Sequence, residues 1–354
     1  MLLNLGQLRE ELRSHLQSHQ VIKAEDSLQL LAHGEANVIF RLNQDRLIRV
    51  AVNTPNQRFE GDFTRVTEFE WKILHYLQGS GLGHKLLGAQ LQPQDDFPYT
   101  YLMTDFIPGA PMDYSRSHLQ RCAHTLAELH RLPLHPDYAQ VQQLQPQVQQ
   151  VSRPLELFFQ ESRDYAQPYL QAADADVETV QMLTSVLAKA EARLAAQPLL
   201  AEYPHTCLVH GDHTYENWIM NPQRAHLIDW EWAEIGSPAG DLGHFLSPVT
   251  IRRYRGYTMP PEDKQFFLNA YYSALGDGDL ARKMKVHFAV FGAFPALRSL
   301  CWTAGYWVTA RRWYADSLEE SASAAARMER LKASHRQFPQ MWAEVMALLE
   351  EPLP

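Results

Sequence analysis

The fold of this chain is decided by His210-Gly211-Asp212-His213-Thr214-Tyr215-Glu216-Asn217 and by Asp229, which ends Leu227-Ile228-Asp229. Asn217 and Asp229 carry oxygen atoms of the kind that hard cations such as Mg²⁺ prefer. Asp212 stands in a loop just upstream, where a carboxylate can orient a hydroxyl and accept its proton. Together these residues are the equipment that phosphoryl transfer needs.

A β-hairpin is predicted directly after Asn217. Two short apolar strands, 218–220 and 225–228, flank the four-residue turn 221–224. The expected register pairs Met220 with Ala225 and Trp218 with Leu227. Asn217 and Asp229 then lie at the open end of the hairpin, where adjacent strands are roughly 5 Å apart. They are close enough there to share one Mg²⁺.

A different metal site is an alternative in the same region. Zn²⁺ for a hydrolase could be held by His205, His210, Asp212 and His213. This alternative leaves Asn217 and Asp229 without a role, and His210 and His213 lack the helical i, i+4 spacing. The phosphoryl-transfer interpretation uses all of these oxygen ligands and is preferred.

The segment resembles the catalytic core of the aminoglycoside phosphotransferase and choline kinase superfamily, whose members are distant relatives of protein kinases. The shared pattern is H-G/N-D-x-x-x-x-N followed by I-D-W/F, and the likeness continues through Asp229–Gly243. The resemblance implies that Asp212 is the catalytic base and that Asn217 and Asp229 bind Mg²⁺. It also implies that His210 and Asp241 brace the catalytic loop, although Asp241 could equally be an ordinary helix N-cap.

The resemblance further implies an α+β, two-lobed protein-kinase-like fold, with a small antiparallel β-sheet N-lobe and a mainly helical C-lobe. The expected domains are an N-lobe at 1–104, a hinge at 105–110 and a C-lobe at 111–354. Periodicity in the N-lobe predicts strands at 28–32, 38–42, 47–52 and 99–106, and a helix at 62–78. In the C-lobe it predicts helices at 117–132, 262–275, 280–309 with a break near Pro295, and 318–349, whereas the glutamine-rich 140–150 is expected to be a loop or a weak helix.

Nucleotide contacts are expected in the N-lobe and the hinge. Gly34 lies in the 33–37 loop, whose amides could cover the phosphates, and Arg49 occupies the place of the phosphate-pairing lysine of kinase-like folds. Glu70 is the expected partner of Arg49, with Glu68 as the second choice. The neighbours expected around the base are Thr104, Asp105 and Phe106. Because those contacts are mostly with the main chain, the sequence does not distinguish ATP from GTP.

The acceptor is expected to be a small molecule with a hydroxyl group. Residues expected near it are Glu216, Glu231, Trp232 and Glu234. Carboxylates suit an amine, and aromatic faces suit a quaternary ammonium, which leaves a choline- or ethanolamine-kinase-like enzyme as an alternative. The aromatic residues of the C-terminal helices, Trp302, Tyr306 and Trp313 among them, are more often core residues than a ligand cage. A non-catalytic kinase-like protein that binds a partner or a nucleotide without turnover is the rival from another class.

Composition agrees with this interpretation. The net charge of −9 argues against a nucleic-acid partner. The three cysteines lack metal-ligand spacing and are expected to be reduced thiols in a cytoplasmic protein. No run is long and apolar enough for a bilayer, so no membrane partner is expected. The sequence says nothing about the oligomeric state.

Overall fold

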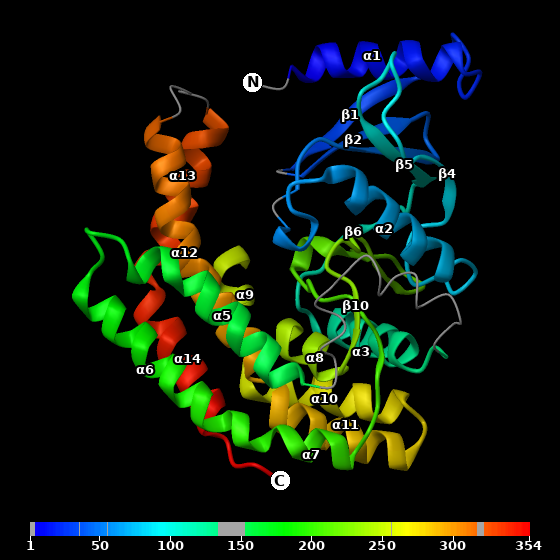
Figure 1. Cartoon of the computed structure of the whole chain (residues 1–354). Coiled ribbons are helices and arrows are strands. Elements are labelled where there is room, and N and C mark those ends of the chain that lie inside the picture. The colour runs from blue at the N-terminus through cyan, green and yellow to red at the C-terminus, as the bar shows by residue number, and fades with distance from the viewer. Residues whose placement is uncertain (1–3, 35, 55, 134–152, 256, 317–321) are drawn as a thin grey trace. The chain divides into compact units, whose positions relative to one another are not determined.

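The computed structural model describes residues 4–34, 36–54, 56–133, 153–255, 257–316 and 322–354 (Figure 1). Internal contacts divide the chain into two compact units. The first unit contains the described residues of Met1–Met112 and of Glu216–Ala233. The second unit contains those of Asp113–Pro133, Gln147–Tyr215 and Glu234–Pro354. The predicted boundaries of the lobes and the hinge stay a prediction.

A five-stranded sheet forms the centre of the first unit. Its strands are β1 (Leu28–His33), β2 (Asn37–Leu42), β3 (Arg46–Ala51), β4 (Leu86–Gln90) and β5 (Thr100–Asp105). They are arranged in the order β1-β2-β3-β5-β4, and every neighbouring pair is antiparallel. The sequence predicted four of these strands. It missed β4, which is five residues long and whose pairing with β5 is irregular between Leu86 and Gly88.

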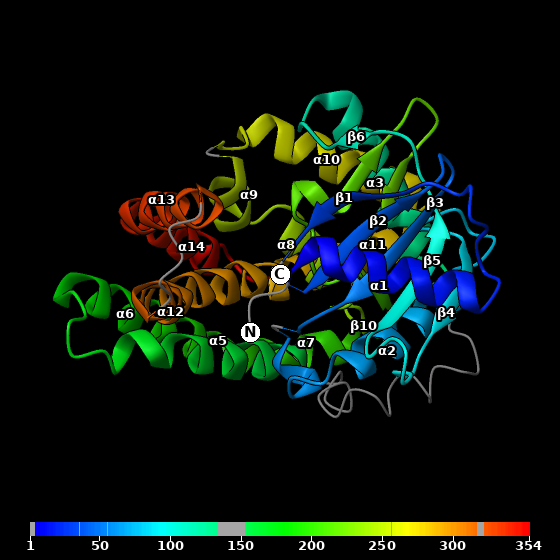
Figure 2. The ribbon, with the colours of Figure 1, turned by 90° about the horizontal axis from the view of Figure 1, so that it is seen from above.

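Helices α1 (Leu5–Ser18) and α2 (Phe63–Tyr76) pack on opposite faces of this sheet (Figure 1). Because successive strand residues point to opposite faces, Tyr101 and Met103 of β5 face the core that the leucines of α1 share. Thr100 points the other way, and its hydroxyl lies 2.7 Å from that of Thr67 on α2. Seen from above, α1 runs over the strands (Figure 2). The sheet therefore has one apolar face and one face that meets α2.

The predicted hairpin is confirmed. Strand β8 (Trp218–Met220) follows the short 3-10 helix η4 (Tyr215–Asn217) and pairs with β9 (Ala225–Leu227). The register is the expected one, with Trp218 opposite Leu227 and Met220 opposite Ala225. Asn221 closes the turn, since its side-chain oxygen accepts hydrogen bonds from the amides of Gln223 and Arg224. A two-residue strand that the sequence did not reveal, β6 (Ala110–Pro111), pairs with the other edge of β8.

The second unit is mainly helical. Its helices are α3 (Arg116–His130), α5 (Pro154–Leu170), α6 (Val177–Arg193), α7 (Gln197–Glu202), α8 (Ala239–Phe245), α9 (Pro248–Arg255), α10 (Pro261–Ala274), α11 (Gly278–Phe291), α12 (Phe294–Asp316), α13 (Ala322–Arg336) and α14 (Phe338–Glu350). The predicted break near Pro295 separates α11 from α12, because Pro295 stands in the first turn of α12, where it needs no amide hydrogen. Short strands β7 (Cys207–Val209) and β10 (Glu234–Gly236) pair with each other.

The core of the second unit is built around α5 and α12. Rings of Phe158 and Phe291 meet edge to face at 4.8 Å within a cluster that also takes in α6 and α14. Cys122, Cys207 and Cys301 are buried and free. Burial raises the pKa of the Cys207 and Cys301 thiols, as expected for inert core residues.

An antiparallel sheet in one unit and helices in most of the rest agree with the predicted α+β class. The glutamine-rich stretch 140–150 lies outside the described residues. No helix in the described part of the chain has the length and apolar character needed to cross a membrane.

Candidate active site

Arg49 is the centre of a charge cluster in the first unit. It lies between Ile48 and Val50, which point into the α1 core, so its own side chain points to the α2 face of the sheet. There its Nη1 donates to Glu70 Oε1 at 2.8 Å, and its Nη2 donates to Asp229 Oδ1 at 2.5 Å. The ion pair with Glu70 is the one expected from the sequence. Glu68 instead pairs with Lys72, at 2.9 Å.

Two further residues fix this cluster. When the side-chain amide of Asn37 is turned so that its oxygen faces Arg49, that oxygen accepts from Arg49 Nε at 3.2 Å and from Nη2 at 2.8 Å. Glu70 Oε1 also accepts from the backbone amide of Trp230, at 2.9 Å. Glu70 is only 3% exposed, and burial raises the pKa of its carboxyl to about 7 against the opposing effect of Arg49. Burial acts to lower the pKa of Arg49, but Asp229 and Glu70 outweigh it and hold that pKa above its ordinary value.

Asn217 and Asp229 both lie at the open end of the β8–β9 hairpin. The amide of Ile228 donates to the carbonyl of Asn217 at 3.1 Å, so the backbone pairing continues to the residue before Asp229. Asp229 then leaves the strand with φ of +68°, a left-handed conformation that is uncommon for a residue other than glycine. This local bend follows the last paired residue and separates the strand from Trp230, whose amide is held by Glu70.

Asp241 is the centre of a buried network in the second unit. It is fully buried, and its carboxylate accepts from the backbone amides of His210 and Gly211 at 2.9 and 2.8 Å. The ring nitrogens of His213 and His130 lie 2.8 and 3.1 Å from the same carboxylate. Although burial opposes it, His213 and His130 lower the pKa of Asp241 well below its ordinary value. Because α8 begins after Pro238, Asp241 lies inside the helix and the N-cap interpretation is wrong.

Asp212 is held by its neighbours in the same unit. Gly211 before it has φ of +81°, which glycine adopts without strain. The amide of Asp212 donates to His210 Nδ1 at 3.3 Å, and its side chain, 28% exposed, lies 3.8 Å from His244 Nε2. The Nδ1 of His244 accepts from the amide of His213 at 2.9 Å, so the proton of a neutral His244 is on Nε2, toward Asp212.

The segment expected to meet the nucleotide base lies at the end of β5. The amides of Asp105 and Phe106 donate to the carbonyls of Lys85 and Asp45, at 3.1 and 2.8 Å. The guanidinium of Arg41 lies over the ring of Phe106, 4.1 Å from its centre. Thr104 is 6% exposed and pairs with Leu47, two residues before Arg49 on β3. Gly34 donates to the carbonyl of Asn37 at 2.9 Å and closes the loop between β1 and β2.

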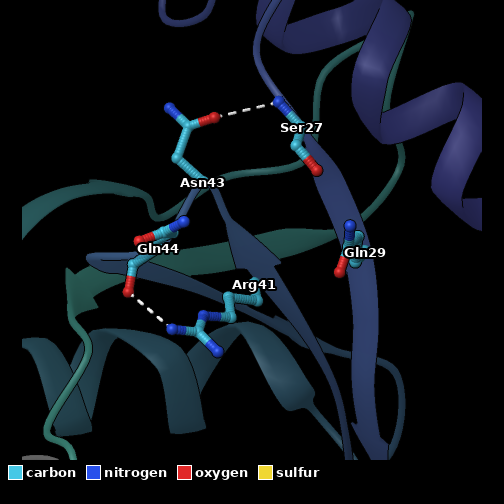
Figure 3. A pocket seen from close by; sticks show the side chains of 5 residues that line it. All are labelled: Ser27, Gln29, Arg41, Asn43 and Gln44. Carbon is cyan, nitrogen blue, oxygen red and sulfur yellow. Dashed lines mark hydrogen bonds between the residues drawn. The ribbon is translucent and has the colours of Figure 1, made fainter.

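A pocket of about 520 Å³ opens beside the first strands of the sheet (Figure 3). It is lined by Ser27, Gln29, Arg41, Asn43 and Gln44. Arg41 donates to the carbonyl of Gln44 at 2.8 Å, and Asn43 accepts from the amide of Ser27 at 2.9 Å (Figure 3). Ile39 of β2 pairs with Arg49, so their side chains point to the same face of the sheet. Arg41 is two residues after Ile39 and also points to that face, so the pocket lies on the same face as Arg49.

The residues expected near the acceptor are divided between the two units. Glu216 is exposed, and Glu234 begins β10 in the second unit. Glu231 is 6% exposed, and its carbonyl accepts from Asn56 at 3.0 Å. The guanidinium of Arg58 lies 5.5 Å from the ring centre of Trp232. Glu231 and Trp232 therefore contact the segment that joins β3 to α2. The acceptor role of all four residues stays a prediction.

The zinc alternative finds no support. Within the described ranges, His205, His210, Asp212 and His213 do not gather as a group that could hold a metal ion. His205 instead faces the carbonyl of His130 at 3.2 Å, and His213 is bound to Asp241.

Comparison with known proteins then decides the family. A model of the "Phosphotransferase enzyme family" matches residues 27–283, which is well over half of the chain. The chain belongs to the phosphotransferase enzyme family. Among curated proteins, no significant match is found.

Solved structures of similar fold support the same kinase-like architecture. A putative aminoglycoside phosphotransferase from Ralstonia eutropha is 16% identical, with a TM-score of 0.61 over 95% of this chain and 98% of that one. An ethanolamine kinase from Plasmodium vivax is 14% identical, with a TM-score of 0.59 over 96% and 91% of the two chains. A streptomycin–ATP ternary complex of APH(2'')-IIa is 16% identical, with a TM-score of 0.56 over 97% and 99%. The predicted protein-kinase-like fold is confirmed.

Several residues around the candidate site of this phosphotransferase-family chain were not among the predicted site residues. They are Asn37, His130, His213, His244 and Arg298. Arg298 of α12 donates to the carbonyl of Gly211 at 3.4 Å and to Glu161 at 3.1 Å. His213 stands in the His210–Asn217 stretch and was considered only as a zinc ligand, and Asn37 ends the expected 33–37 loop. His130 ends Leu126-Ala127-Glu128-Leu129-His130, a further point of likeness to the family, whereas His244 and Arg298 carried no sequence signal.

Proposed function

We propose that the protein is a small-molecule kinase that transfers the γ-phosphoryl group of ATP or GTP to a hydroxyl of a small acceptor. The observation that carries the proposal is the Arg49 guanidinium, shared between Glu70 and Asp229. It places a cation that can pair with phosphate oxygens beside a carboxylate that suits a divalent ion. Membership of the phosphotransferase family and likeness to an ATP-bound aminoglycoside phosphotransferase support it.

The nucleotide is assigned to the α2 face of the sheet. Arg49, with its Nη1 held by Glu70, would contact the phosphates through Nη2. The polar pocket that Arg41 lines lies toward the other end of the same face. Thr104 pairs with Leu47, which is about 7 Å from Arg49 along β3, so the segment expected to meet the base begins about that far from the expected phosphate contact. The base would lie near Thr104, Asp105 and Phe106, with the Gly34 loop over the phosphates. Because the amides of Asp105 and Phe106 already donate within the protein, base contacts there must come from other groups of this segment.

Asn217 and Asp229 would hold Mg²⁺. An amide oxygen and a carboxylate at one end of a hairpin are a donor set that fits this hard cation. When bound, the ion offsets negative charge on the phosphate oxygens. As a ligand, Asp229 would give up part of its contact with Arg49, and the guanidinium would then be able to pair with phosphate.

Asp212 is the proposed base. Its loop is held by two hydrogen bonds that the backbone amides of His210 and Gly211 donate to buried Asp241. The side chain of Asp212 itself is partly exposed, so an acceptor can reach it. In the transfer, the acceptor oxygen forms a bond to the γ-phosphorus while the bond from phosphorus to the β-phosphate bridging oxygen breaks. The hydroxyl proton passes to Asp212, and the nucleoside diphosphate leaves. His210 and Asp241 act on the position of this loop and do not touch the acceptor.

A choline- or ethanolamine-like acceptor is the second candidate. One observation favours it: in the second unit, the rings of Trp302 and Tyr306 stack at 4.5 Å on α12, one and two turns after Arg298, which contacts Gly211. A stacked aromatic pair suits a cationic headgroup. The expected acceptor residues Glu216, Glu231, Trp232 and Glu234 would suit an aminoglycoside as well, so the acceptor class is left to experiment.

An acceptor screen tests the function. Release of nucleoside diphosphate is followed with ATP or GTP and Mg²⁺ across panels of aminoglycosides, amino alcohols and sugars. We expect acceptor-dependent turnover with at least one panel, and a loss of roughly 10²-fold or more in Asp212→Ala. Nucleotide binding without turnover, unchanged by Asp212→Ala, would instead indicate the non-catalytic alternative.

A further inference from the structure

A second cluster of ligand-type side chains lies in the first unit, among residues that the kinase proposal does not use. His15 and His19 come from the end of α1, and Asp96 comes from the connection between β4 and β5. His15 Nδ1 lies 2.9 Å from Asp96 Oδ2, and His19 Nδ1 lies 3.7 Å from the same oxygen. The two imidazole rings are 4.3 Å apart.

The backbone around the cluster is well fixed. Leu8, Leu12 and Leu16 bury one side of α1 in the sheet core, which holds the helix in place. Histidines four residues apart lie on the same side of a helix, so both rings can reach one ion. Asp96 lies in a tight turn closed by two backbone hydrogen bonds between Gln94 and Phe97.

The degree of burial differs usefully among the three side chains. His15 is 2% exposed and stacks on the fully buried ring of Phe97 at 5.3 Å, so its orientation is set by packing. The side chains of His19 and Asp96 are each almost half exposed. An ion can therefore enter from solvent and meet one ligand that is already oriented, while the other two adjust.

We propose that His15, His19 and Asp96 bind Zn²⁺, with water completing the coordination. Two imidazole nitrogens and one carboxylate oxygen form a ligand set that zinc takes readily. Ligands about 2.1 Å from a tetrahedral ion lie about 3.4 Å from one another. The observed 2.9 and 3.7 Å bracket that value, and all three ligand atoms lie within 4.8 Å of one another.

Contacts already made by His19 bear on how it binds. Its Nδ1 lies 3.0 Å from the carbonyl of His15 and 3.0 Å from the hydroxyl of Ser18. The 3.7 Å distance to Asp96 is measured from this same Nδ1, so zinc binding through Nδ1 would replace both contacts. Since His19 is exposed, its ring can turn to offer either nitrogen without disturbing the core.

Zinc at this place would join the end of α1 to the β4–β5 connection. These segments are far apart in the sequence, so the ion would act as a cross-link that stabilises the first unit. Magnesium is not expected here, because it prefers oxygen ligands in an octahedral arrangement. The proposal is independent of the kinase proposal, which involves none of these three residues.

Zinc binding is measured on the untagged 354-residue chain by competition with a chromophoric chelator, and the thermal midpoint of unfolding is recorded with and without zinc. Co²⁺ serves as a spectroscopic probe, since its visible absorption reports four-coordinate binding. The variants are His19→Ala and Asp96→Asn, which change exposed side chains and leave the buried His15 in place. The matched control is His75→Ala, an exposed histidine of α2 in the same unit.

We expect one equivalent of zinc in the wild type and in His75→Ala, with a higher thermal midpoint when zinc is present. His19→Ala and Asp96→Asn should weaken that equivalent roughly tenfold or more and should lose the cobalt signature and the thermal shift. The proposal is overturned if the wild type binds no such equivalent, or if the two ligand variants retain it. Kinase activity with Mg²⁺ should be the same in all four proteins, which separates this test from that of the proposed function.

Discussion

Arg49 of β3 forms an ion pair with Asp229, which lies just after β9 in the same unit, and Nη2 of Arg49 is 2.5 Å from Oδ1 of Asp229. The same guanidinium binds Glu70 at 2.8 Å, so one cation serves two carboxylates. This arrangement links the proposed phosphate-binding residue directly to a proposed metal ligand. The carboxylate that the proposed chemistry assigns to Mg²⁺ is therefore also an ion-pair partner of Arg49.

Replacing Arg49 tests how far the cluster depends on its cation. In Arg49→Met, the buried Glu70 loses its charged partner, and we expect the free energy of unfolding at pH 8 to fall by about 3 kcal/mol. The loss should be smaller at pH 5, where Glu70 can take up a proton. Urea unfolding at the two pH values measures both quantities.

The double variant Arg49→Met/Glu70→Gln is the control for this prediction. Once the Glu70 carboxylate is gone, Glu70 no longer brings a buried charge that lacks Arg49, so much of the lost stability should return. A double variant as unstable as the sum of the two single variants would show that Arg49 and Glu70 act independently.

Glu70 gives a prediction for the effect of pH on stability. Burial raises its pKa from 4.5 to about 7 in the folded protein, so the folded state binds a proton more tightly than the unfolded state. The contribution of Glu70 is fully present below pH 4.5 and is lost as the pH rises through about 7. Relative to Glu70→Gln, the wild type should therefore lose up to about 3 kcal/mol of unfolding free energy between pH 4.5 and pH 8. A difference between the two proteins that does not vary with pH would contradict this assignment.

Asp241 should behave in the opposite way. His213 and His130 outweigh the effect of burial and lower the pKa of Asp241, so the stability it contributes is present above pH 3.8 and is lost as the pH falls further. Asp241→Asn removes the charge while two amides and two imidazoles still face it, and we expect a loss of about 3–5 kcal/mol at pH 7. Thermal or urea unfolding measures the loss.

Asp277→Asn is the matched control for Asp241→Asn. Asp277 is exposed and caps α11 by accepting from the amides of Asp279 and Leu280. Since asparagine caps a helix about as well as aspartate, this variant should be close to neutral. Comparable losses in the two variants would mean that burial and the histidines of the Asp241 network contribute little.

Local signals explain why part of the fold could be predicted from the sequence. The β8–β9 register follows from a four-residue turn in which the Asn221 side chain accepts hydrogen bonds from the backbone amides of Gln223 and Arg224. Such a turn is visible in the sequence. Strands of two or three residues, such as β6 and β10, carry no periodicity and become strands only through their partners. Helices α5 and α6 were not among the predicted elements.

The candidate site could be predicted only in part for a similar reason. Asp212, Asn217 and Asp229 stand in one motif, and the partner of Arg49 followed from the helix spacing of a recognised family. The contact of Arg49 with Asp229, and those of His130 with Asp241, join residues that are distant in the chain. Side chains that meet only through the tertiary fold leave no pattern in a single sequence.

The roles proposed for Asp229 and Asp212 are separated by nucleotide affinity. With Mg²⁺ present, Asp229→Ala should weaken ATP binding far more than Asp212→Ala, because the first variant loses a charged metal ligand and the second loses a group that acts on the acceptor. Without Mg²⁺ the order should reverse, since removing Asp229 frees Arg49 and takes a negative charge away from the phosphates. Calorimetric titration of both variants with ATP, in Mg²⁺ and in a chelator, measures this. Equal losses in Mg²⁺ would argue against the assignment of Asp229 as the metal ligand, whatever the acceptor proves to be.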